Sequence, residues 1–316
     1  MKVCSRPLRR LVNLCGALPL ASVLLVMALL IPPVAVIPQE AGGLSRIAPE
    51  VPLPEGPFDS LFLRHLPVGN TATLPVRIVR HGFPGSPVRP NMLDIPPDDG
   101  SFVELHGYDW LRVQGRPVEI RTRDTFLPLA TLNANAQVLV IDETRIELLH
   151  GTVRWRRRHP DAPDFAVTVG SVSISGRGAA TIQRNSGEVT VTVENGQMDI
   201  SVGGETVALP GAGQSRTVTV SSDLSVSGSA DFEDALAHLR TTLDTSLELI
   251  GTDTLTGTDL VELWSRVIPV AAYYSKLETA TDSSVPNPDI VMRDIAEALR
   301  ILGGFRFNPA GLIRRS

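Results

Sequence analysis

The chain has 316 residues, of which 43% are hydrophobic and 20% charged, a composition that supports a folded core and excludes a globally disordered protein. The formal net charge of -5 argues against a general nucleic-acid-binding protein, because such proteins present a basic surface to phosphates. The two cysteines, Cys4 and Cys15, lie close to the N-terminus. The rest of the chain therefore has no thiol for a disulfide, a zinc site or a nucleophile.

The N-terminus carries a basic segment followed by a long apolar run. Residues 1–10 include Lys2, Arg6, Arg9 and Arg10, and the uncharged stretch that follows is long enough to span a bilayer, which takes about 20 residues. Basic residues before such a run hold the N-terminus in the cytoplasm and direct the following chain outward. No clear small-x-small cleavage site follows, so we expect residues 11–37 to be an uncleaved single-pass anchor and the bulk of the chain to be periplasmic. A cleaved signal segment, with release to the periplasm, is the alternative.

Residues 38–100 are rich in proline, which fixes φ and removes a backbone donor. Regular elements are therefore interrupted repeatedly. We expect a spacer that holds the rest of the chain off the membrane, with short strands such as Leu74–Val79.

Residues 101–228 alternate between apolar and polar side chains, with Gly, Asn and Ser between the runs. In Val189–Val202, Asn195-Gly196 suits a two-residue hairpin turn. That turn would set Val193 opposite Met198 and Val191 opposite Ile200 on one apolar face. A second hairpin is predicted at His150-Gly151, and Phe165–Val169 and Val172–Ile174 are predicted to be strands joined through Gly170. Further strands are expected at residues 207–209, 217–220 and 224–226, so the fold class is mainly β: a sandwich, roll or solenoid of antiparallel hairpins.

Residues 229–316 have a helical period, which predicts three or four amphipathic helices. Asp231 is the expected N-cap of the first, whose apolar stripe begins at Phe232. Asp259–Arg266 and Val270–Leu277 are expected to form one helix or a pair, interrupted by Pro269. Asn287-Pro288 begins the last, which Gly303-Gly304 ends.

Several segments of Thr131–Val218 resemble the FecR domain, a periplasmic β-rich module. They are residues 132–138 with 146–153, residues 165–178, residues 189–198, and Leu209–Gln214. The resemblance covers about a quarter of the chain and implies a FecR-like β domain with a role in sensing or signalling. This sequence departs from the family at Ala179, where Thr is usual, and at Val169-Gly170, which replaces Thr-Pro. About ten residues precede the membrane segment, too few for the cytoplasmic domain with which the family holds a sigma factor. We therefore expect a stand-alone extracytoplasmic version.

No motif in the sequence predicts a catalytic, cofactor or metal site. Gly176–Ala180 superficially resembles a dinucleotide-binding fingerprint, but a strand and a turn follow it instead of a helix, which favours a β-turn or bulge. The six histidines show no metal-binding spacing. One basic cluster, Arg154, Arg156, Arg157 and Arg158, is the candidate interaction patch for anionic lipid, lipopolysaccharide phosphates or an acidic partner. A solvated end of a strand is the alternative for this cluster.

These features predict a membrane-anchored, non-enzymatic binding module of the bacterial envelope, acting in sensing or signalling on an envelope protein or an anionic envelope component, without a cofactor. A scaffold for envelope or polysaccharide assembly is the alternative. A cell-wall hydrolase is the third hypothesis, which requires two carboxylates or a Ser–His pair in one cleft.

Overall fold

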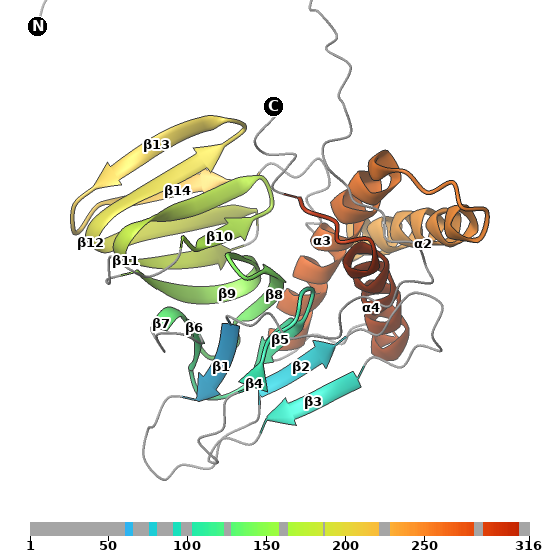
Figure 1. Ribbon diagram of the computed structural model, residues 1–316, viewed down its shortest axis with the longest axis horizontal. Helices are drawn as coiled ribbons and strands as arrows, with labels where there is room; N and C mark the ends of the chain where they lie inside the picture. Colours follow the sequence, from blue (N-terminus) through green and yellow to red (C-terminus); the bar gives the residue numbers. More distant parts are fainter. Residues whose placement is uncertain are drawn as a thin grey trace, which may run out of the picture. The chain divides into compact units, whose positions relative to one another are not determined.

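The computed structural model describes residues 61–65, 76–80, 91–95, 103–122, 128–157, 164–185, 187–220, 228–280 and 287–309 (Figure 1). All of these residues fall within one compact unit, Ala41–Ser316. The expected basic segment 1–10, the expected anchor 11–37 and most of the proline-rich spacer lie outside the described residues. No helix of the described part is long and apolar enough to cross a membrane.

The described part of the chain is mainly β, with fourteen strands in one sheet and three helices after them. The strands are β1 (Leu61–His65), β2 (Val76–Arg80), β3 (Asn91–Ile95), β4 (Val103–Glu104), β5 (Trp110–Val113), β6 (Val118–Thr122), β7 (Pro128–Leu132), β8 (Gln137–Asp142), β9 (Arg145–Arg157), β10 (Ala166–Val169), β11 (Val172–Asn185), β12 (Glu188–Val202), β13 (Glu205–Pro210) and β14 (Ser215–Thr219). The helices are α2 (Ser229–Gly251), α3 (Gly257–Thr279) and α4 (Pro288–Gly304). The main path through the sheet runs β13-β12-β11-β10-β9-β7-β6-β1-β4.

The predicted hairpin at Asn195-Gly196 is wrong. β12 runs straight through both residues and pairs with β11 from Val172↔Val202 to Asn185↔Glu188. Ala179 faces Asn195 whereas Ala180 faces Val193, so Glu194 is one extra residue in β12, a β-bulge. An extra residue reverses the alternation of side chains just as a two-residue turn does, so Val193 and Met198 both reach the core in either arrangement.

Glycines on both strands make this bulge possible. Gly178 (φ +130°) lies opposite Gly196 (φ +78°), and a Cβ on Gly178 would come within 2.1 Å of the carbonyl oxygen of Asn195. Only glycine fits where two backbones approach so closely. Gly176–Ala180 lies within the continuous strand β11, opposite the bulge in β12, so the predicted turn or bulge falls on the neighbouring strand.

The predicted hairpin at His150-Gly151 is also wrong. β9 continues through both residues, with Gly151 at φ +86°. Gln137 pairs with His150 and Val138 with Leu148, so Leu149 is the extra residue of a second bulge. The first half of β9 pairs with β8 and β10, and the second half with β7 and β11. The expected turn at Gly170 is confirmed, since Val169 pairs with Val172 across it.

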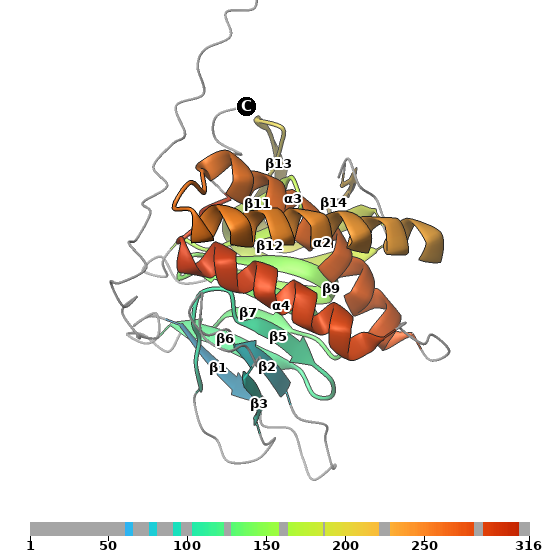
Figure 2. The same ribbon diagram turned by 90° about the vertical axis from the view of Figure 1, so that its right-hand side faces the viewer.

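Two apolar cores lie against the sheet. One is enclosed by strands alone and contains Trp155, Ile174 and Val191, all fully buried. The other joins Trp110 and Leu139 of the sheet to the buried faces of the helices, including Tyr274. Figure 2 shows the three helices lying across the strands on this side. The sheet therefore has apolar residues on both faces where the helices pack, and a polar outer face elsewhere.

The helices begin and end close to the predicted residues, with two corrections. Gly228, and not Asp231, is the N-cap of α2. α3 is one continuous helix through Pro269, although proline lacks the donor for a helical hydrogen bond. Leu263, Val267, Val270 and Tyr274 form one fully buried face on both sides of Pro269. Burial of this face offsets the cost of about 3 kcal/mol that a mid-helix proline brings.

Candidate functional site

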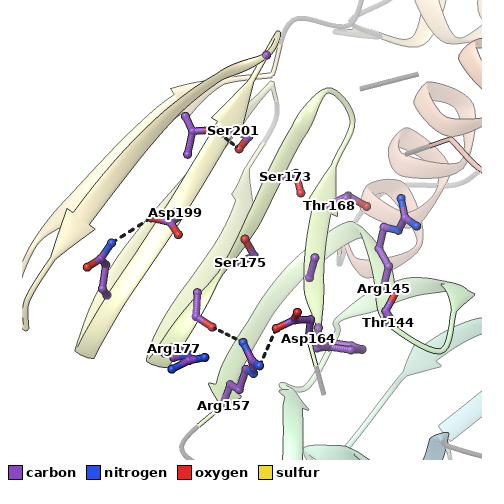
Figure 3. Close-up of a pocket in the computed structure, with 16 residues that line it drawn as sticks. Thr144, Arg145, Arg157, Asp164, Thr168, Ser173, Ser175, Arg177, Asp199 and Ser201 are labelled. Atoms are coloured by element: carbon purple, nitrogen blue, oxygen red, sulfur yellow. Dashed lines mark hydrogen bonds and ion pairs between the residues drawn. The ribbon is translucent and has the colours of Figure 1, made fainter. Parts of the chain in front are cut away.

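A groove of about 970 Å³ lies on the face of strands β10 to β13 that points away from the strand-enclosed core (Figure 3). Its lining is polar. The residues that line it are Thr144, Arg145, Arg157, Asp164, Phe165, Ala166, Thr168, Ser173, Ser175, Gly176, Arg177, Gln197, Asp199, Ser201, Gly204 and Thr206.

The groove follows from the two-residue period of the strands. In β11, Val172 and Ile174 are buried in the core, so Ser173 and Ser175 point to the opposite face. Cross-strand pairing extends this polar row. Thr168 of β10 faces Ser173, Ser173 faces Ser201 of β12, and Ser201 faces Thr206 of β13. Four hydroxyl groups therefore stand side by side across four neighbouring strands.

Three arginines come to the groove from two strands, β9 and β11. Arg145 lies at the start of β9 and pairs with Asp142 at 2.6 Å. Arg157 lies at the end of β9, directly opposite Gly178, and Arg177 is the next residue to that glycine on β11. The side chain of Arg177 is exposed. Arg157 and Arg177 place positive charge at the end of the groove where β9 and β11 meet, whereas Arg145 lies beside β10.

Arg157 is mostly buried, whereas the carboxylate that pairs with it is exposed to solvent. Its Nη2 lies 2.6 Å from Oδ1 of Asp164, and its Nη1 donates to the carbonyl oxygen of Gly176 at 3.4 Å. The side chain of Arg157 is 12% exposed, whereas that of Asp164 is 91% exposed. The guanidinium is thus built into the groove, while the carboxylate reaches it from solvent.

Of the described arginines of the candidate interaction patch, Arg154 and Arg156 share one face of β9 and Arg157 points to the other. Arg157 lines the groove, and Arg158 lies outside the described residues. Arg154 pairs with Glu194 of β12, with Nε to Oε1 at 2.7 Å and Nη2 to Oε2 at 2.5 Å. This hydrogen bond lowers the pKa of the Glu194 carboxyl and raises the pKa of Arg154. Arg156 is half-buried, and its Nε has no hydrogen-bond partner within the described residues.

A buried ion pair lies next to the groove without lining it. Glu147 of β9 is buried beside Arg184 of β11, with 3.7 Å between Oε1 and Nη1. Burial raises the pKa of Glu147, although the Gly170 N–H donates to its Oε1 at 2.6 Å. Burial also lowers the pKa of Arg184, whose Nη1 donates to the Leu148 carbonyl at 2.8 Å. This pair fixes the β9–β11 contact next to the groove.

The described histidines do not gather in the groove. His150 is half-buried, and its Nε2 lies 3.0 Å from Oγ1 of Thr279 at the end of α3. Burial, Arg184 and Lys276 lower its pKa. His238 is exposed on α2. Within the described residues no cluster of His, Cys, Asp or Glu could hold a metal ion.

Sequence reasoning missed most of the groove. Asp164, Ser173, Arg177 and Asp199 drew no functional prediction, although the alternation in residues 172–175 was a signal that two serines share a polar face. The sequence does not show which strands are neighbours in the sheet, and the lining of the groove comes from five strands, β9 to β13.

Comparisons with known proteins give little further information. No protein-family model matches the chain. No curated protein matches it. Among solved structures, a crystal structure of a candidate anti-sigma factor from Parabacteroides distasonis is similar, with 13% sequence identity and a TM-score of 0.24. The match covers 48% of this chain and 55% of that one, so the chain spans about half the length of that structure. A TM-score this low carries no argument about fold or function.

Proposed function

We propose that this chain is an extracytoplasmic binding module of the bacterial envelope, with a FecR-like β domain over residues 101–228 and a helical region over residues 229–316. Residues 11–37 anchor it in the membrane. The module acts by recognition and without covalent chemistry, in sensing or signalling. The observation that carries this proposal is the polar groove, which offers hydroxyl groups and guanidinium groups on a rigid sheet.

The lining of the groove favours binding over hydrolysis. Two carboxylates, Asp164 and Asp199, do share the groove, which is the arrangement that the hydrolase hypothesis requires. A glycosidase needs one of its carboxylic acids held protonated by apolar surroundings. Asp164 is 91% exposed and lies against Arg157, so it lacks such surroundings. Asp199 is half-exposed and accepts from Gln197 at 3.3 Å.

The proposal is tested by affinity capture with the full-length protein from detergent-solubilised envelope. Wild type is compared with Arg177→Gln in the groove and with Arg216→Gln, a matched exposed arginine on β14 outside the groove. We expect material that wild type and the Arg216 variant retain and the Arg177 variant loses. Equal retention by all three would remove the groove as the binding site.

Location is tested separately. An alkaline phosphatase fused after residue 100 should be active in an exporting bacterium, because that enzyme folds only outside the cytoplasm. An inactive fusion that is stably expressed would contradict the extracytoplasmic placement.

A further inference from the structure

We infer that the groove binds an acidic saccharide with sparsely spaced carboxylates, and that Asp164 takes the place of the ligand carboxylate while the groove is free. This inference rests on the proposed binding function and adds the chemical class of the ligand. It draws on four features of the groove: its hydroxyl row, its arginines, its one lining ring and its second carboxylate.

The hydroxyl row suits a ligand that itself carries many hydroxyl groups. Thr168, Ser173, Ser201 and Thr206 stand on adjacent strands, which are about 4.8 Å apart. A hydroxyl both donates and accepts, so those of Ser173, Ser201 and Thr206 can match a ligand hydroxyl in either role. Thr168 is buried, and its hydroxyl donates to the Ile146 carbonyl at 3.2 Å, so it forms the floor of the row. Ser201 and Thr206 already bond to each other at 2.8 Å, whereas Ser173 has no side-chain partner within the described residues.

The described lining favours a negatively charged ligand over a neutral sugar. Among the described lining residues the one ring is that of Phe165, which is 2% exposed and so presents no face for stacking. The exposed guanidinium of Arg177 and the inner guanidinium of Arg157 lie at the same end of the groove. A guanidinium binds a carboxylate through two parallel N–H donors, which is the strongest polar contact that this lining offers.

Asp164 already makes this contact in the free protein. Its carboxylate lies 2.6 Å from the Arg157 guanidinium while remaining 91% exposed. Because the carboxylate of this ion pair is open to solvent, the pair is weakly held, and a ligand carboxylate with further hydrogen bonds can displace Asp164. Arg157 stays in place during the exchange because its own side chain is mostly buried and also donates to Gly176.

Asp199 favours a ligand whose negative charges are widely spaced. It lies directly opposite Ser175 on the neighbouring strand, two residues along β12 from Gln197, which faces Arg177. Two residues along a strand span about 6.8 Å, so a negative group follows closely on the positive end of the groove. A densely charged polyanion would meet repulsion at Asp199, whereas a saccharide with neutral sugars between its carboxylates would place hydroxyl groups there.

The test uses isothermal titration of the full-length protein in detergent. The probes are a hyaluronan hexasaccharide, which has a carboxylate on every second sugar, its carboxyl-reduced neutral counterpart, and inorganic phosphate. We expect the acidic hexasaccharide to bind and the other two probes to bind at least about tenfold more weakly. Equal binding of the neutral probe would refute the role of charge. Equal binding of phosphate would refute the saccharide specificity, because the groove would then be a simple anion site.

Four variants separate the parts of the inference. Arg177→Gln should weaken binding of the acidic probe about tenfold, and Arg157→Gln should do the same if its thermal unfolding is unchanged. Arg216→Gln should have no effect. Asp164→Asn should tighten binding about threefold, because the internal competitor is removed. Weaker or unchanged binding by Asp164→Asn would overturn the displacement.

The outcome also distinguishes this inference from the function on which it rests. If envelope capture depends on Arg177 but the acidic hexasaccharide does not bind, the groove is a binding site and the ligand class is wrong. If neither the capture nor the titration depends on Arg177, both proposals fail.

Discussion

Deleting Glu194 should be tolerated, although it removes a residue from the middle of the longest strand. Val193 and Met198 both face the core, yet they are five positions apart, an odd spacing that a regular strand cannot accommodate. Without Glu194 the spacing becomes even, and every observed pair between β11 and β12 is kept. The expected losses are the ion pair with Arg154, the hydrogen bond from Thr181 and local strain in the exposed segment at residues 211–214. This segment joins β13 to β14 and must absorb the one-residue shift between the two halves of β12. Together they cost about 1–2 kcal/mol.

Deleting Thr192, two residues away, should be far more damaging. If the bulge stays in place, Val189 and Val191 turn to solvent, at about 1.5–3 kcal/mol each, or about 3–6 kcal/mol together. If the bulge closes instead, Val193 turns outward and the Glu194 carboxylate enters the core, which costs at least as much. Either outcome removes much of the 5–15 kcal/mol that stabilises a typical domain.

Urea denaturation followed by circular dichroism measures both deletions. The control is Glu194→Ala, which keeps the bulge and loses only the side-chain contacts of Glu194 with Arg154 and Thr181. We expect the midpoint of the Glu194 deletion to lie close to that of the control, and the Thr192 deletion to be unfolded or nearly so. A turn at Asn195-Gly196 would make both deletions comparably damaging, because each would shift the register of the hairpin. Similar midpoints for the two deletions would therefore refute the bulge.

Three further predictions concern stability. Gly178→Ala should destabilise the protein by several kcal/mol, because its Cβ would lie 2.1 Å from a carbonyl oxygen. Gly187→Ala has nothing within 4 Å of its Cβ and should cost only the positive-φ strain of about 1 kcal/mol. Thermal unfolding compares the two variants. The folded-state pKa of His150 lies below its usual 6.5, so the unfolded state takes up a proton first and the free energy of unfolding should fall as pH drops below about 6.5. In His150→Gln, denaturation at several pH values should show a flatter dependence. The pKa of Glu194 is lowered from 4.5, so its contribution to the free energy of unfolding is present above about pH 4.5 and is lost as pH falls through the folded-state pKa. The urea midpoints of wild type and Glu194→Gln should therefore differ at pH 7 and converge in acid.

The helical region shows how far local patterns reach. The stripe that starts at Phe232 and the Asn287-Pro288 start signal predicted α2 and α4 closely, because a helix is stabilised by neighbours along the chain. The predicted break at Pro269 failed for a tertiary reason. The buried face of α3 continues on both sides of the proline and is stabilised by the sheet beneath it, which no local pattern records.

The two misplaced hairpins have one physical cause. Positive-φ glycines and a reversal of alternation are required by a two-residue turn and by a β-bulge alike, so Asn195-Gly196 and His150-Gly151 fit both. The choice depends on the strand alongside. β11 places Gly178 opposite Gly196, and this close approach of two backbones favours a continuous bulged strand.

The sequence alone determined which side chains of this protein face the core, since alternation assigned Val191, Ile200 and Ile174 inward and Ser173 outward whichever way the chain turned. The tertiary structure alone decided which of the outward side chains meet. Arg157, Asp164 and Arg177 share one groove because β9, β10 and β11 are neighbours in the sheet, and strand order is set by long-range packing that a two-residue period cannot encode.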